Sequence, residues 1–273
     1  MSNHIDIPIY FERDMLTEAY IDTAVLTRYA IRDNKPDHNK PALTTEAGLV
    51  FIDEGRSSWT LNLSTDSKLQ ENSLRPSSVV VEAAWLNSIE ALRQKVKVTA
   101  GSDANVFAVE GAFLVPDGFT IPTEEANPEN VRYYGLQLIR EGETLTVETD
   151  ITDLVIMQYD YKPIYKDEFL LQKYGGGGVF IETHDFPHIH IPTNSSCHGY
   201  IVIGKKLSAT EFEFTAFSIP YGCALYTPSN TIHGDGTLVG EYGIAVAKPG
   251  VVCADTVLIY NKNTLSLQRG VVS

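Results

Sequence analysis

Histidines gather in one part of this chain at spacings that suit metal binding. Five of the seven histidines lie between residues 184 and 233, and His188 and His190 are separated by a single residue. Side chains at positions i and i+2 of an extended strand point to the same face, so this pair could hold one ion together. A third imidazole, His233, follows a turn-forming segment. The sequence therefore predicts one metal site made of His188, His190 and His233.

The segments around these histidines resemble the two signature motifs of the cupin superfamily, small β-barrels that usually hold a divalent metal. The residues that carry the resemblance are His188, His190, Gly204, Gly222, Pro228, Asn230 and His233. Asn230 stands where glycine is common, and Asn tolerates the left-handed backbone that a glycine would supply there. The resemblance covers roughly residues 160 to 265. It implies a double-stranded β-helix (jelly-roll) barrel with one divalent ion, for which iron, zinc, manganese and nickel are all candidates.

The chain departs from the cupin pattern at the usual Glu ligand, whose position is taken by Cys197. The fourth ligand could be His198, Cys197, Glu182 or no protein group. We favour no fourth ligand, because three imidazoles with open positions form a known catalytic arrangement. His198, His184 and Glu182 are then the candidate acid–base groups for catalysis beside the metal.

A divalent ion held by neutral imidazoles keeps its charge and can stabilise a developing oxyanion. We therefore expect a metal-dependent enzyme that acts on a small oxygenated molecule by redox-neutral isomerase, epimerase or lyase chemistry. An Fe(II)-dependent dioxygenase is the first alternative. A non-enzymatic barrel that binds a sugar or another small molecule is the second, because the usual Glu ligand is missing. The resemblance alone does not choose among them, since one fold hosts many reactions.

Composition excludes several partner classes. The formal net charge of −14 opposes binding to nucleic acid and to anionic membrane surfaces. The amino terminus lacks the pattern of a signal peptide, and no apolar run is long enough to span a membrane. Three cysteines without Cys-x2-Cys spacing fit a reducing compartment, so we expect a cytoplasmic protein. Exposed edges of a β-rich fold commonly pair, which predicts a homodimer.

The hydrophobic pattern predicts a mainly β fold with one or two short helices. The helix is expected at residues 79–94, where apolar side chains recur at helical spacing. We divide the chain into a β-rich amino-terminal region, 1–150, and a metal-binding barrel, 151–273. The first region is either a degenerate second cupin barrel, with Ile121 at the ligand position, or an unrelated β structure. The predicted strands are 48–54, 59–64, 105–115, 133–140, 144–150, 154–161, 179–183, 199–205, 211–219, 242–247 and 256–260.

Overall fold

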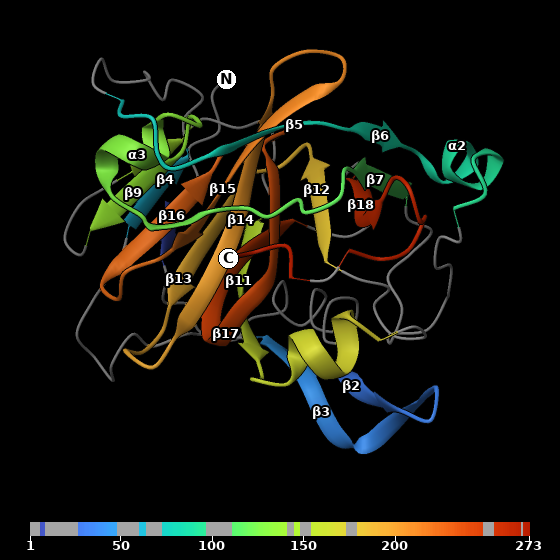
Figure 1. The fold of residues 1–273 in the computed structure, drawn as a ribbon. Coiled ribbons are helices and arrows are strands. Elements are labelled where there is room, and N and C mark those ends of the chain that lie inside the picture. Colours follow the sequence, from blue (N-terminus) through green and yellow to red (C-terminus); the bar gives the residue numbers. More distant parts are fainter. Residues whose placement is uncertain are drawn as a thin grey trace.

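The mainly β prediction is confirmed by the computed structural model of the chain (Figure 1). The structure describes residues 6–8, 27–47, 60–63, 73–96, 111–140, 145–147, 154–172, 179–247, 254–268 and 270–273. Within these residues the helical elements are short: α2 (Ser88–Arg93), α3 (Pro128–Arg132) and the π-helix η1 (Tyr165–Leu170). The predicted strand at 48–54 lies outside the described residues, as do residues 105–110 of the predicted strand at 105–115. No described helix is both long and apolar enough to cross a membrane.

Most described strands join one large, strongly branched sheet. A separate small sheet contains β1 (Asp6–Pro8), β4 (Thr60–Leu63) and β10 (Leu145–Val147). The strands of the large sheet are β2 (Thr27–Arg32), β3 (Lys35–Ala47), β5 (Val79–Glu82), β6 (Ala84–Leu86), β7 (Gly111–Val115), β8 (Thr123–Glu125), β9 (Gln137–Arg140), β11 (Leu154–Tyr161), β12 (Phe180–His184), β13 (His188–Pro192), β14 (His198–Lys206), β15 (Glu211–Ser218), β16 (Cys223–Thr227), β17 (Ile232–Ala247) and β18 (Ala254–Asn261).

Strand β17 organises the part of the sheet that carries the histidines. It is 16 residues long and pairs antiparallel with β11, β12, β13 and β14. Its first half faces β12 and β14, whereas its second half faces β11 and β13. Because the strand changes partners along its length, residues from β12, β13 and β17 can face one enclosed space.

Two clusters of buried apolar side chains support this sheet. One includes Tyr161, Phe169 and Phe217, and the other is centred on aromatic rings of β7 and β15. In the second cluster the rings of Phe113 and Phe212 lie edge to face with centroids 5.0 Å apart, a favourable geometry for aromatic pairs.

The predicted helix at 79–94 is wrong over its first half. Val79–Glu82 forms β5, which pairs antiparallel with β15, and the helix begins only after the Asn87 cap, at Ser88. Asn87 and Glu90 form a capping box that fixes this start. Three consecutive valines precede the helix, and β-branched residues favour a strand when a partner strand is present. Sheet pairing therefore overrode the helical spacing.

Strands from both sides of the predicted boundary at residue 150 pair with one another. β3 pairs with β11, β9 with β16, and β7 runs parallel to β18. The β2–β3 hairpin and η1 lie together at one end of the molecule in Figure 1. The division into two regions and the degenerate second barrel stay predictions.

Candidate metal centre

Three strands each present two polar side chains at positions i and i+2. These pairs are Glu182 and His184 of β12, His188 and His190 of β13, and His233 and Asp235 of β17. The spacing places both members of a pair on one face of their strand. Glu182 and His233 are also direct cross-strand neighbours in the β12–β17 ladder. The alternation of the strands thus concentrates imidazoles and carboxylates in one place.

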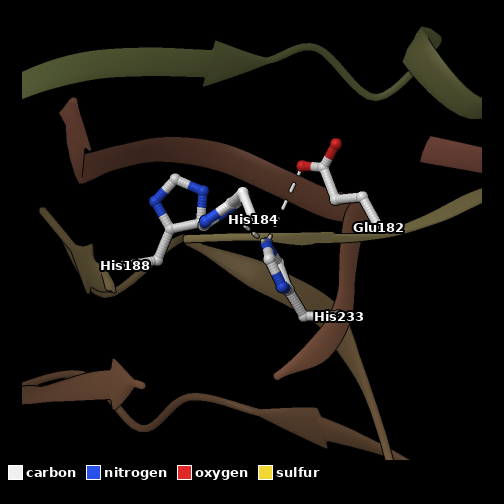
Figure 2. A group of neighbouring side chains, drawn as sticks. All are labelled: Glu182, His184, His188 and His233. Atoms are coloured by element: carbon white, nitrogen blue, oxygen red, sulfur yellow. Dashed lines mark hydrogen bonds and ion pairs between the residues drawn. The ribbon is translucent and has the colours of Figure 1, made fainter. Parts of the chain in front are cut away.

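Four of these side chains form a group that could hold a metal ion: Glu182, His184, His188 and His233 (Figure 2). One ligand atom from each lies within 4.8 Å of the others. The three ring centroids form a triangle, with His184 4.4 Å from His188 and 4.7 Å from His233, and with 5.1 Å between His188 and His233. The three imidazoles are almost completely buried. The group therefore combines three nitrogen ligands with one oxygen ligand from three strands.

The turn before β17 brings His233 to the end of β12. The backbone N–H of Asn230 donates to the carbonyl oxygen of His184 over 2.7 Å. Asn230 has φ +62°, so the predicted left-handed backbone at this position is confirmed. Asn adopts this conformation at lower cost than most residues. The turn consequently fixes the spacing between His184 and His233.

Backbone carbonyls set the tautomer of all three imidazoles. Nδ1 lies 2.7 Å from the Phe186 oxygen in His184, 2.6 Å from the Ala245 oxygen in His188 and 2.9 Å from the Thr231 oxygen in His233. A carbonyl oxygen only accepts, so each Nδ1 must carry the proton. In the neutral ring, each Nε2 is then unprotonated and carries a free lone pair. Histidines that bind metals are commonly oriented in this way.

The Nε2 atoms of His184 and His233 lie 3.2 Å apart. With Nδ1 protonated in both neutral rings, neither Nε2 can donate to the other, and two lone pairs face each other without a proton between them. Two imidazole nitrogens bound tetrahedrally to zinc at its usual Zn–N distance are about 3.3 Å apart. The observed separation therefore fits two ligands of one cation.

The surroundings keep these rings neutral. Burial and, to a smaller extent, the neighbouring His233 lower the pKa of His184 to about 4. Burial also lowers the pKa of His233 to about 4 and that of His188 well below its usual value. Neutral imidazole is the form that binds a metal, so protons compete weakly with an ion at neutral pH.

Glu182 is the carboxylate of this group. Its Oε1 lies 3.7 Å from Nε2 of His233, and the Thr256 hydroxyl donates to its Oε2 over 2.8 Å. Burial raises the pKa of Glu182, and the negative charge of Asp235 raises it further. A divalent cation in the group would stabilise the ionised form of Glu182 against burial and against the negative charge of Asp235.

His190 lies beside this group but outside it. It is completely buried, and neither ring nitrogen has a hydrogen bond among the residues that the structure describes. Its Nε2 is 3.8 Å from Oδ2 of Asp235, which also accepts a 2.5 Å hydrogen bond from the Tyr161 hydroxyl. Burial raises the pKa of Asp235, but the contacts with His190, Tyr161 and His233 outweigh burial and hold it below its usual value. Asp235 is thus a partly buried carboxylate that stays ionised.

The other sequence candidates lie away from the group. His198 is exposed, and its Nδ1 donates to the Ser196 carbonyl at 2.9 Å. Cys197 donates from Sγ to the carbonyl oxygen of Glu241 at 2.9 Å. From the sequence, Glu182 is a possible fourth ligand and both Glu182 and His184 are acid–base candidates; the i, i+2 spacing of the two could have indicated that His184 is a ligand as well. It missed Asp235, which stands two residues after His233.

A cavity of about 150 Å³ adjoins the group. Glu182, His188 and Asp235 contribute to its wall from the strands of the site. The remaining lining residues are Arg28, Leu43, Tyr159, Tyr161, Tyr165, Phe180 and Ile244. The wall is therefore part aromatic and part charged, as in many small-molecule sites.

Comparison of the chain with protein-family models, with curated proteins and with solved structures finds no match. The fold and the site define a mainly β protein with a group of three histidines and one glutamate that could hold a metal ion.

Proposed function

We propose that the protein is a metal-dependent enzyme of redox-neutral isomerase, epimerase or lyase type that acts on a small oxygenated molecule. The observation that carries the proposal is the 3.2 Å approach of two unprotonated Nε2 atoms, from His184 and His233, inside a buried group of three imidazoles and one carboxylate. The likeness of the histidine motifs to those of the cupin superfamily supports the same proposal. Glu182, His184, His188 and His233 would hold the ion.

When bound, a divalent cation would polarise a substrate oxygen and stabilise negative charge that develops on it. Asp235 is the residue that we assign to proton transfer. It lines the cavity, its pKa is lowered, and it accepts a hydrogen bond from Tyr161, whose pKa is raised by burial and by the charge of Asp235. The carboxylate can therefore accept a proton from substrate, and the phenol keeps it oriented.

The metal site is tested by elemental analysis of the purified protein. We expect about one divalent ion per chain in the wild type and loss of that ion in the double variant His188→Ala, His233→Ala. His198→Ala is the matched control, because it removes an exposed imidazole outside the group and should keep the ion. Equal metal content in all three proteins would contradict the proposal.

The reaction class is tested with a panel of small hydroxy and oxo compounds, with and without oxygen. Turnover under anaerobic conditions supports redox-neutral chemistry. Oxygen consumption that requires Fe(II) would show a dioxygenase instead. Asp235→Asn should abolish turnover while the metal content stays unchanged, because the amide cannot accept the proton. A variant with full activity would remove Asp235 from the mechanism.

A further inference from the structure

One cationic side chain reaches the cavity from outside the three strands that carry the metal group. Arg28 belongs to β2, is only 7% exposed and lines the cavity. Its Cζ lies 5.6 Å from the centre of the Phe169 ring of η1, in cation–π geometry. The hairpin itself is tied to η1 by the ion pair between Lys40 and Glu168. The guanidinium therefore has a fixed position at the wall.

The net charge around the cavity changes sign when a divalent ion is bound. Among the residues that the structure describes, the wall contains one guanidinium, Arg28, and two carboxyl groups, Glu182 and Asp235. With both carboxyl groups ionised, the net charge of these three groups is one negative charge. A divalent cation changes this net charge to one positive charge. A site with one surplus positive charge and low exposure favours a ligand with one negative charge.

The size of the cavity limits the ligand. About 150 Å³ is the size of an engineered cavity that accepts benzene, so there is room for about six non-hydrogen atoms. The phenols of Tyr159, Tyr161 and Tyr165 and the carboxylates make this wall polar, unlike that of an apolar cavity. A small ligand with several oxygen atoms fits both the volume and the lining.

We propose that the cavity binds a small monocarboxylate with a hydroxyl or oxo group on the adjacent carbon, and that Arg28 binds its carboxylate. The inference rests on the proposed function for the role of the metal group, toward which the second oxygen would point. The planar guanidinium suits a carboxylate because it can donate two parallel hydrogen bonds. Arg28 would thus determine the substrate class.

The probe is sodium L-lactate, with propane-1,2-diol as the neutral control of the same carbon skeleton. Binding is measured by isothermal titration calorimetry, on protein freed of metal and on protein loaded with Zn²⁺. We expect lactate to bind the loaded protein at least ten-fold more tightly than the diol, which corresponds to about 1.4 kcal/mol. Equal affinity for lactate and the diol would overturn the inference.

The variants Arg28→Gln and Arg28→Lys test the residue directly. Arg28→Gln should weaken lactate binding about ten-fold or more and leave diol binding unchanged. Arg28→Lys should retain part of the lactate affinity, because lysine keeps the positive charge but lacks the two parallel N–H donors of the guanidinium. Arg32→Gln is the matched control: Arg32 lies on the same strand, its side chain is 68% exposed, and it does not line the cavity. Unchanged lactate affinity in Arg28→Gln would overturn the inference.

The design separates this inference from the proposed function. Metal content is measured on the same samples. If Zn²⁺ binds at the group but lactate affinity does not depend on Arg28, the inference fails and the proposed metal centre stands. If no metal binds and lactate still binds in an Arg28-dependent manner, the carboxylate site stands and the metal-dependent function fails. Should Arg28→Gln fail to fold, the lactate and diol comparison on wild-type protein decides.

Discussion

At the level of single residues, the site depends on which imidazole nitrogen carries the proton. Three backbone carbonyls hold the Nδ1 protons of His184, His188 and His233, and the Nε2 lone pairs are left facing inward. In the metal-free protein the lone pairs of His184 and His233 face each other over 3.2 Å without a proton between them, which is unfavourable. The close approach of these unprotonated nitrogens therefore costs free energy in the folded protein, and a bound cation would relieve it.

The structure and the motif differ on the identity of one ligand, which single variants can decide. The group in the structure contains His184, whereas the motif uses His190. We expect His184→Ala to weaken Zn²⁺ binding at least ten-fold more than His190→Ala does, as measured by competition with a chromophoric chelator. The reverse order would return the site to the ligand set of the motif.

The stability of the metal-free protein should fall as the pH is lowered from about 7 to about 4. His184 and His233 have a pKa of about 4 when folded and an ordinary value near 6.5 when unfolded. Within that window the unfolded chain binds more protons, so acid favours unfolding by about 1.4 kcal/mol per pH unit for each imidazole. The raised pKa of Glu182 acts in the opposite direction but is a single group.

Urea unfolding at a series of pH values between 7.5 and 4.5 measures this dependence. Saturating Zn²⁺ should add stability at neutral pH and make the fall with acid steeper, because protons displace the metal. The double variant His184→Gln, His233→Gln should show a flatter profile than the metal-free wild type. A wild-type profile that stays level, or stability that rises toward pH 4.5, would contradict the buried neutral imidazoles.

The residues of the site were only partly predictable. His188 and His233 could be selected because their motif spacing places an imidazole on a strand and another after a turn. Glu182 could be selected as a possible ligand or acid–base group, but its position beside His233, and that of Asp235 next to the group, depend on cross-strand register, such as the direct pairing of Glu182 with His233. A single sequence shows which residues alternate along one strand but not which strands meet.

At the level of elements, the approach of β12 to β17 controls the site. Gly234 separates His233 from Asp235, and a Cβ added to it would lie 2.3 Å from the carbonyl oxygen of Phe180. The strands can come this close only because residue 234 has no side chain.

Gly234→Ala should therefore lower the free energy of unfolding by about 1 to 3 kcal/mol and also reduce metal affinity, since β17 must shift. Gly118→Ala is the control. Gly118 has φ +73° with open space around the position of a Cβ, so alanine there should cost about 1 kcal/mol while metal affinity is retained. Urea unfolding and zinc titration of both variants give the answer. Unchanged metal affinity in Gly234→Ala would contradict the proposed control by strand approach.

The same strand shows why some elements could not be predicted. We expected a strand only at residues 242–247, but β17 begins at Ile232. Glycines at four positions in 234–243 look like turns in the sequence, although Gly234 here permits the close approach of β12. Conversely β11 matches its predicted range of 154–161, because a segment rich in Val, Ile and Tyr can be recognised without knowledge of its partner strands.

At the level of the whole molecule, strands before residue 151 complete the sheet that carries the metal group. β3 pairs with β11, and the β2–β3 hairpin supplies Arg28 to the cavity. The carboxy-terminal strands with the motifs therefore do not form the complete site by themselves. A cupin-like barrel predicted from residues 151–273 alone would lack the wall from which we infer the substrate class.

The predicted homodimer is tested by light scattering at micromolar concentration, where we expect about twice the 30.2 kDa of one chain. Each copy has a formal net charge of −14, so two copies repel each other at low ionic strength. Salt shortens the range of this repulsion to about 10 Å at 0.1 M, and the dimer fraction should therefore rise between 20 and 200 mM NaCl. A dimer held by ion pairs between copies would show the opposite trend. A monomeric mass throughout the series would exclude the dimer. Metal content measured on the same samples would show whether the metal site forms in the monomer or needs a second copy.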